Sequence, residues 1–173
     1  TGTTAVPTPA LAGSAVGDKL IRAITVSAIG ASISDLAGWT LLADVTYNSR
    51  RTFILTRDYT ASYPDIILST GATAGTAIAA LRAAPGYVLG SFTVGTKWDR
   101  PTDGGGSVTT TTMKSMTGQA DGITLAITAE TSTAAETEAQ ATFSGAGWSK
   151  WFYADTDPAS DVAANFWFGY RDI

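Results

Sequence analysis

Carboxylates are the residues in this sequence that come nearest to a catalytic set. Asp44 with Asp58, or Asp155 with Asp157 and Asp161, can be nominated, since two acids about 5–9 Å apart suffice for glycoside hydrolysis. Histidine and cysteine are both absent from the 173 residues, which removes the commonest general base, the usual catalytic triad and thiolate metal sites. Neither grouping of acids is a specific signature. We therefore expect no catalytic residues and no enzymatic activity.

The acidic segment from Asp155 to Asp161 also has a simpler interpretation. Its sequence Asp-Thr-Asp-Pro is typical of a turn, in which Asp side chains bond to nearby backbone and Pro sets the following angle. Carboxylates and loop carbonyls are calcium ligands, but the segment lacks the spacing and glycine of an EF-hand loop. A turn is favoured over a calcium site, and we expect no metal and no cofactor.

Aromatic residues are concentrated at the end of the chain, where eight of the 17 lie in the last 26 residues. Along one expected strand, Trp148 and Phe152 fall on one side while Trp151 and Tyr153 fall on the other. Either both faces of this strand are buried or one face meets a partner, because exposed aromatic patches are rare on monomers. The sequence leaves the two alternatives open.

Residues 97–100, Lys-Trp-Asp-Arg, stand in an expected loop just before a glycine run. Such a loop is either a contact site or an anchor whose tryptophan packs on the fold. The candidate interface or ligand contacts of the whole chain are Trp98, Arg100, Trp151, Tyr153 and Trp167.

Charge and hydropathy argue against two classes of partner, nucleic acids and membranes. Eleven basic against fifteen acidic residues give a net charge of −4 without a basic stripe, which disfavours nucleic acid. No segment approaches the roughly 18 consecutive apolar residues of a membrane span.

Short segments rich in Val, Ile, Thr and aromatics recur between Gly, Pro, Asp, Asn and Ser, which predicts antiparallel strands. They run from Lys19 to Val26, Thr40 to Val45, Thr52 to Arg57, Asp65 to Leu68, Thr76 to Arg82, Val108 to Met113, Ile123 to Ala129, Trp148 to Tyr153 and Ala163 to Tyr170. In the segment from Ile123, apolar residues alternate with Thr and Ala, so one face is core. Residues 131–143 fit either a helix or a strand.

Two parts of the chain resemble each other. In each, an apolar strand that follows Asp leads to a Gly-Trp element, at Trp39 and again at Trp148, and an apolar strand carrying Arg comes last. We favour a structural role for both tryptophans, as plugs at the end of the fold, over stacking on a sugar. The sequence therefore predicts one domain over 1–173, an all-β antiparallel sandwich, jelly-roll-like. Its similar halves, about 1–94 and 108–173, are joined by a Gly-rich loop, and neither closes the core alone.

Four motifs carry a family resemblance. They are Gly17-Asp18-Lys19-Leu20-Ile21, Ala37-Gly38-Trp39-Thr40-Leu41-Leu42, Thr52-Phe53-Ile54-Leu55 and Ala77-Ile78-Ala79-Ala80-Leu81-Arg82. On these the chain resembles a family of small β-sandwich domains found in the tail and virion proteins of bacteriophages that infect actinobacteria, and in some actinobacterial surface proteins. The similarity spans nearly the whole chain and brings no catalytic residues. Where the family usually has Pro before Gly-Trp, this chain has Asp35-Leu36-Ala37.

The resemblance implies a virion structural protein, located in the virion after assembly in the host cytoplasm. The role that the resemblance implies is that of a minor tail protein or tail-associated adhesin, or alternatively of a capsid decoration protein. The expected partners are other tail or capsid proteins and further copies of the chain, in a homo-oligomer for which a trimer is the first candidate. A carbohydrate-binding module for a host cell-wall glycan is the other alternative, and it can coexist with a tail role.

Overall fold

The computed structural model describes residues 2–8, 11–47, 50–69, 71, 73–83, 85–86, 88–92, 123–132, 149–155 and 163–172. In these residues the chain forms ten β-strands and no helix, which confirms the predicted all-β class.

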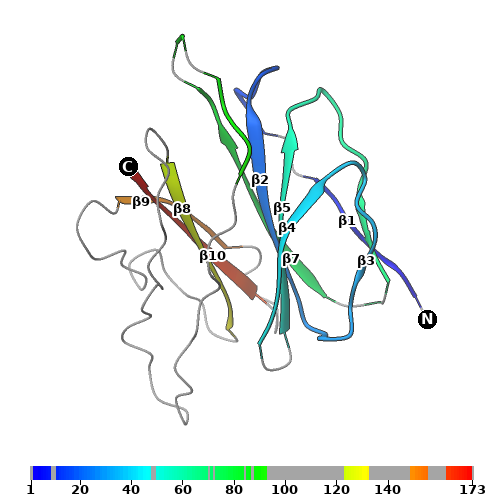
Figure 1. The fold of residues 1–173 in the computed structure, drawn as a ribbon. Helices are drawn as coiled ribbons and strands as arrows, with labels where there is room; N and C mark the ends of the chain where they lie inside the picture. Colours follow the sequence, from blue (N-terminus) through cyan, green and yellow to red (C-terminus); the bar gives the residue numbers. More distant parts are fainter. Residues whose placement is uncertain are drawn as a thin grey trace.

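The strands form three antiparallel sheets. Sheet A has the order β1-β6-β3, sheet B the order β4-β5-β2-β7, and sheet C the order β8-β10-β9. The bounds are β1 Thr4–Val6, β2 Lys19–Val26, β3 Ile33–Asp35, β4 Thr40–Tyr47, β5 Arg50–Asp58, β6 Ile66–Leu68, β7 Ala74–Leu81, β8 Ile123–Ser132, β9 Ser149–Asp155 and β10 Ala163–Asp172. Figure 1 shows sheet B in the middle, with sheet C on one side of it and the strands of sheet A on the other.

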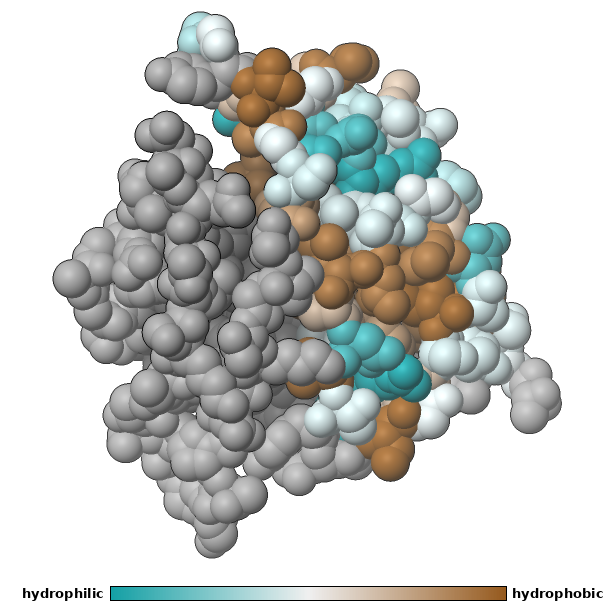
Figure 2. Space-filling model, viewed as in Figure 1, coloured by the Kyte–Doolittle hydropathy of each residue, from teal (hydrophilic) through white to brown (hydrophobic). Residues whose placement is uncertain are grey.

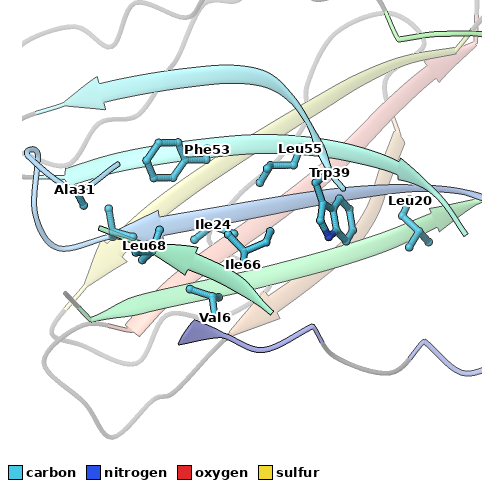
Figure 3. Close-up of a cluster of buried hydrophobic side chains, with 10 residues drawn as sticks. Val6, Leu20, Ile24, Ala31, Trp39, Phe53, Leu55, Ile66 and Leu68 are labelled. Atoms are coloured by element: carbon cyan, nitrogen blue, oxygen red, sulfur yellow. The ribbon is translucent and has the colours of Figure 1, made fainter. Parts of the chain in front are cut away.

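A hydrophobic core fills the space between sheets A and B. Leu20 and Ile24 from β2 and Phe53 and Leu55 from β5 are at most 1% exposed, and they pack with Ile66, Leu68, Val6 and Trp39 (Figure 3). Successive side chains of a strand point to opposite faces, so the alternate residues of β2 lie on this side.

The other face of β2 and β7 is buried as well. Ile21, Ala23 and Thr25 are at most 3% exposed, and Ala77 and Ala79 are at most 5% exposed. These residues are cross-strand neighbours outside the core cluster. Sheet C covers this face, because β10 contacts β7 and β8 contacts β2. The described strands thus form three stacked sheets. In the central sheet B, the inner strand β2 is buried on both faces.

A sharp turn carries the chain from sheet A to sheet B. The backbone N–H of Trp39 donates to the carbonyl of Leu36 at 2.8 Å, and Ala37 and Gly38 have φ values of 51° and 80°. Two successive left-handed residues are the geometry of a type I′ turn, which glycine accepts readily at its second position. The Asp35 carboxylate accepts from the N–H of Ala37 at 2.8 Å and stabilises the turn that delivers Trp39 to the core.

The core cluster between sheets A and B is built from residues of the first half, from Val6 to Ala80. The seven strands of the first half form two layers, and these bury large side chains between them. The prediction that neither half closes the core alone stays a prediction. The jelly-roll-like connectivity and the similarity of the halves stay predictions.

Candidate functional site

The acid pair nominated from the sequence is not a pair in space. Asp44 accepts two hydrogen bonds from Arg51, at 2.8 and 2.6 Å, and Asp58 lies 2.6 Å from the ammonium of Lys19. Asp44 stands opposite Phe53, five residues from Asp58 along β5, which corresponds to about 16 Å at roughly 3.3 Å per residue. That separation exceeds the range for two acids that share a glycosidic bond.

Arg51 of β5 links the edge strand β4 to the loop between β2 and β3. Besides Asp44, its guanidinium donates to the carbonyl of Ala31 at 2.6 Å and lies 5.2 Å from the ring centre of Phe53. The bonds to Asp44 raise the pKa of Arg51. This bidentate pair fixes strand position and leaves neither group as an acid or base for chemistry.

Asp18 and Arg82 form a second bidentate pair, at the end of sheet B where β2 begins and β7 ends. Two nitrogens of Arg82 donate to the two carboxylate oxygens, each at 2.7 Å, and Arg82 also donates to the carbonyl of Gly13. The backbone N–H of Ala15 donates to Asp18 as well. Hydrogen bonds from Arg82 and then from Ala15 lower the pKa of the Asp18 carboxyl. The pair joins the segment before β2 to the segment after β7.

Arg22 is the most unusual charged residue of the described chain, because its side chain is fully buried on the core face of β2. It donates to Thr76 at 2.9 Å, to Thr8 at 2.7 Å, and to the carbonyls of Pro7 and Val6 at 2.6 and 3.3 Å. Burial lowers the pKa of the guanidinium to about 10, and the charge of Asp65 opposes that change. Arg22 therefore stays charged at neutral pH and holds the N-terminal segment through neutral acceptors.

Trp39 lies next to this guanidinium, 5.7 Å from its carbon to the ring centre. Its ring is 3% exposed and stands 6.1 Å from the ring of Tyr63, tilted by 42°. Among the described residues, none accepts a hydrogen bond from the buried indole N–H. The burial confirms the predicted plug at Trp39, whereas Trp148 lies outside the described residues.

Two of the five sequence-predicted contact residues are brought together by sheet C. Trp167 of β10 stands directly opposite Tyr153 of β9. Trp151 falls where the register shifts, because Phe168 and Gly169 are opposite Phe152 and Lys150. Trp151 is therefore the extra residue of a β-bulge, so the simple alternation that grouped it with Tyr153 does not carry through this position.

Trp98 and Arg100 lie outside the described residues, as do residues 156–162 of the acidic segment and residues 133–143. The predictions made for them stay predictions. Residues 131–132 belong to β8, which settles that part of the segment left open between helix and strand.

Two valines are almost fully exposed at one end of sheet B. Val16 precedes β2 and is 89% exposed, and Val88 follows β7 and is 93% exposed. The segments that carry them are joined by Arg82, which binds both Asp18 and Gly13. Figure 2 shows brown, apolar surface at this end of the described region and again over β4, where Leu41 is 41% exposed.

Within the described residues, no group of three or more acids gathers that could hold a metal ion, and no helix there is long and apolar enough to span a membrane. No protein-family model, curated protein or solved structure matches this chain. Function must therefore be argued from these residues.

Neither the role of Arg22 nor the Asp18–Arg82 pair was predicted from the sequence. Arg22 stands in the middle of an apolar strand, and this position was the available signal. Arg is almost never fully buried unless it is paired, so such an arginine is expected to have specific partners.

Proposed function

We propose that this chain is a non-enzymatic structural protein of a bacteriophage virion, a minor tail protein or tail-associated adhesin that acts through protein–protein assembly. One observation carries the proposal: several of the described charged side chains link strands and loops to one another. Asp18, Asp44 and Asp58 each bind a cation from another segment, and Arg22 binds backbone carbonyls. Groups held this way serve a rigid framework and are poorly placed to exchange protons with a substrate.

The exposed apolar residues support assembly through surfaces. Val16 and Val88 stand on segments that Arg82 links, so they belong to one end of the molecule. Apolar side chains on a fixed framework are suitable anchors for a protein partner, because little conformational freedom is lost when they are covered. The resemblance to virion domains indicates that the partner proteins belong to a phage particle.

Antibody labelling of particles of the phage that encodes the chain tests this role. Gold label on the tail in electron micrographs is the expected result, and label on the capsid would favour the decoration protein instead. Particles that carry no label and no trace of the chain by mass spectrometry would overturn the virion role.

A surface variant tests the mode of action. Val16→Asp with Val88→Asp should prevent the purified chain from forming oligomers, measured by light scattering after size exclusion, and should leave the melting temperature unchanged. The matched control is Leu41→Asp, which changes an exposed apolar residue on β4. A wild-type chain that is strictly monomeric and does not bind to particles would refute the assembly role.

A further inference from the structure

Strand β4 forms one edge of sheet B. It stands at the end of the order β4-β5-β2-β7, and β5 is the strand that pairs with it among the described residues. The edge strands of sheet A, β1 and β3, have three residues each, whereas β4 has eight. Figure 2 shows apolar surface over β4. Sheet B therefore presents a long strand edge at the surface.

The direction of the backbone groups of β4 follows from a hydrogen bond at the end of β5. The N–H of Tyr59 donates to the carbonyl of Asp18 at 2.9 Å, where the chain continues the pairing of β5 with β2. Because N–H and C=O groups alternate in direction along a strand, the odd-numbered residues of β5 bond to β2 and the even-numbered ones bond to β4. Thr52 is even-numbered and stands opposite Val45. Thr46, the next residue of β4, therefore directs its N–H and C=O away from sheet B.

Leu41 is oriented in the same way. It stands opposite Leu55, an odd-numbered residue of β5, so its backbone groups also point away from β5. The side chain of Leu41 is 41% exposed, and that of Thr46 is exposed as well. The register shifts between Leu41 and Ala43 and is regular from Ala43 to Tyr47. The edge thus offers a regular stretch of backbone with an exposed leucine beside it.

Two of the residue types that usually protect an edge strand are missing from β4. Natural edge strands are commonly short or carry Lys or Pro, which discourage a further strand, and Thr40–Tyr47 contains neither Lys nor Pro. The one charged side chain of β4 is Asp44, which accepts two hydrogen bonds from Arg51. Its charge is therefore balanced within sheet B. A strand edge of this length and composition is a template for a further strand.

We propose that β4 is a docking edge, to which an extended segment of another protein adds as a fifth strand of sheet B. Main-chain hydrogen bonds form at Thr46 and along the regular stretch, and apolar side chains of the segment contact Leu41. The chain has a net charge of −4, and the acid on this edge is Asp44, so a segment without acidic residues is the matching partner. Self-association is assigned above to the end that carries Val16 and Val88, which leaves β4 to a chain of another kind. This inference rests on the proposed assembly role and adds a second kind of contact to it.

The test uses the purified full chain and a short peptide of alternating valine and threonine with a lysine at each end. Binding is followed by NMR titration and amide hydrogen exchange. The amide of Thr46 should shift and become protected, whereas the amide of Val45, which already bonds to β5, should change little. The matched control is the same peptide with its valines N-methylated. It cannot donate main-chain hydrogen bonds at these positions and should not bind.

Three variants separate docking from folding. Thr46→Pro removes an N–H that points outward, which an edge strand tolerates, so it should weaken peptide binding at least about ten-fold with little change in melting temperature. Val45→Pro removes an N–H that bonds to β5 and should lower the melting temperature. Leu41→Asp keeps the backbone and adds an acid beside the ladder. It should also weaken peptide binding, and it serves as the second variant if Thr46→Pro does not fold.

Three results would overturn the proposal. They are the absence of peptide binding by the wild-type chain, equal binding of the N-methylated peptide, and unchanged binding in Leu41→Asp. Protection of the Thr46 amide that rises with protein concentration without peptide would also overturn it, by assigning the edge to a second copy of the chain. The variant with Val16→Asp and Val88→Asp should lose oligomers and keep peptide binding, so failure of the self-association and failure of the docking edge give different results.

Discussion

Replacing Arg22 by lysine tests whether a buried guanidinium holds the N-terminal strand in place. The change keeps the positive charge and removes the planar fork. In the protein, three nitrogens of Arg22 reach Thr76, Thr8, and the carbonyls of Val6 and Pro7. A lysine ammonium has one nitrogen at the end of its stem and cannot bridge acceptors on β7 and on the N-terminal segment in the same way.

The expected destabilisation follows from the bonds that lysine cannot make. A hydrogen bond to a charged group contributes about 1.5–3 kcal/mol, and a buried charge with fewer partners adds a desolvation cost. Loss of at least one of these bonds to Arg22 therefore lowers the free energy of unfolding by about 2–3 kcal/mol. For a chain of this size, that corresponds to a fall of roughly 5–10 °C in the melting temperature.

The assay combines thermal unfolding with amide hydrogen exchange. In Arg22→Lys, protection of the β1 amides should fall before that of β2, because Arg22 binds the last residue of β1 and the two residues that follow it. Arg50→Lys in β5 is the control and should change stability by less than about 0.5 kcal/mol, as surface substitutions usually do. An unchanged melting temperature together with unchanged exchange in residues 4–6 would refute the anchoring role.

Three more predictions concern the framework. Gly38→Ala should lower stability by about 1–2 kcal/mol in urea unfolding, because φ at this position is 80° and a Cβ would stand 3.2 Å from the Arg57 guanidinium; unchanged stability would contradict the turn. Ala23→Leu should cost about 1–3 kcal/mol if sheet C covers this face, and a neutral effect on the melting temperature would contradict that covering. Arg82→Ala should destabilise the chain at neutral pH. Because the folded pKa of Asp18 is lowered, the paired carboxylate stabilises the fold above its unfolded pKa of about 3.9 and this is lost as pH falls. The difference from wild type in urea unfolding should therefore shrink below about pH 4, and a pH-independent difference would contradict the linkage.

Much of the strand pattern could be predicted from the sequence, because β-branched residues alternate or cluster between turn formers. The segment from Lys19 to Val26 has the predicted bounds, and the starts at Thr40, Ile123 and Ala163 are also as predicted. The strands β1 and β3 were missed. Each has three residues, which is too short for an alternation of apolar and polar residues to be recognised. Each is held in place by pairing with β6, which is distant in sequence.

The candidate site depends on information that a single sequence does not carry locally. Trp167 and Tyr153 were both chosen for their residue type, but that they are neighbours follows from the pairing of β10 with β9. The bulge at Trp151 was invisible for the same reason, since a bulge is a mismatch between two strands. Similarly, the bond between Arg82 and Asp18 joins residues 64 positions apart.

Strand pairing divides the aromatic residues near the C terminus between the two faces of sheet C. Phe166 and Phe168 alternate with Trp167 along β10, and Tyr153 of β9 stands directly opposite Trp167. The outer face of sheet B carries small buried side chains, among them Ala23, Ala77 and Ala79, and small residues on one layer are complemented by large ones on the facing layer. Packing against sheet B can therefore use only one of the two aromatic groups. The alternatives that the sequence leaves open, burial on both faces or a partner on one of them, apply to the other group alone.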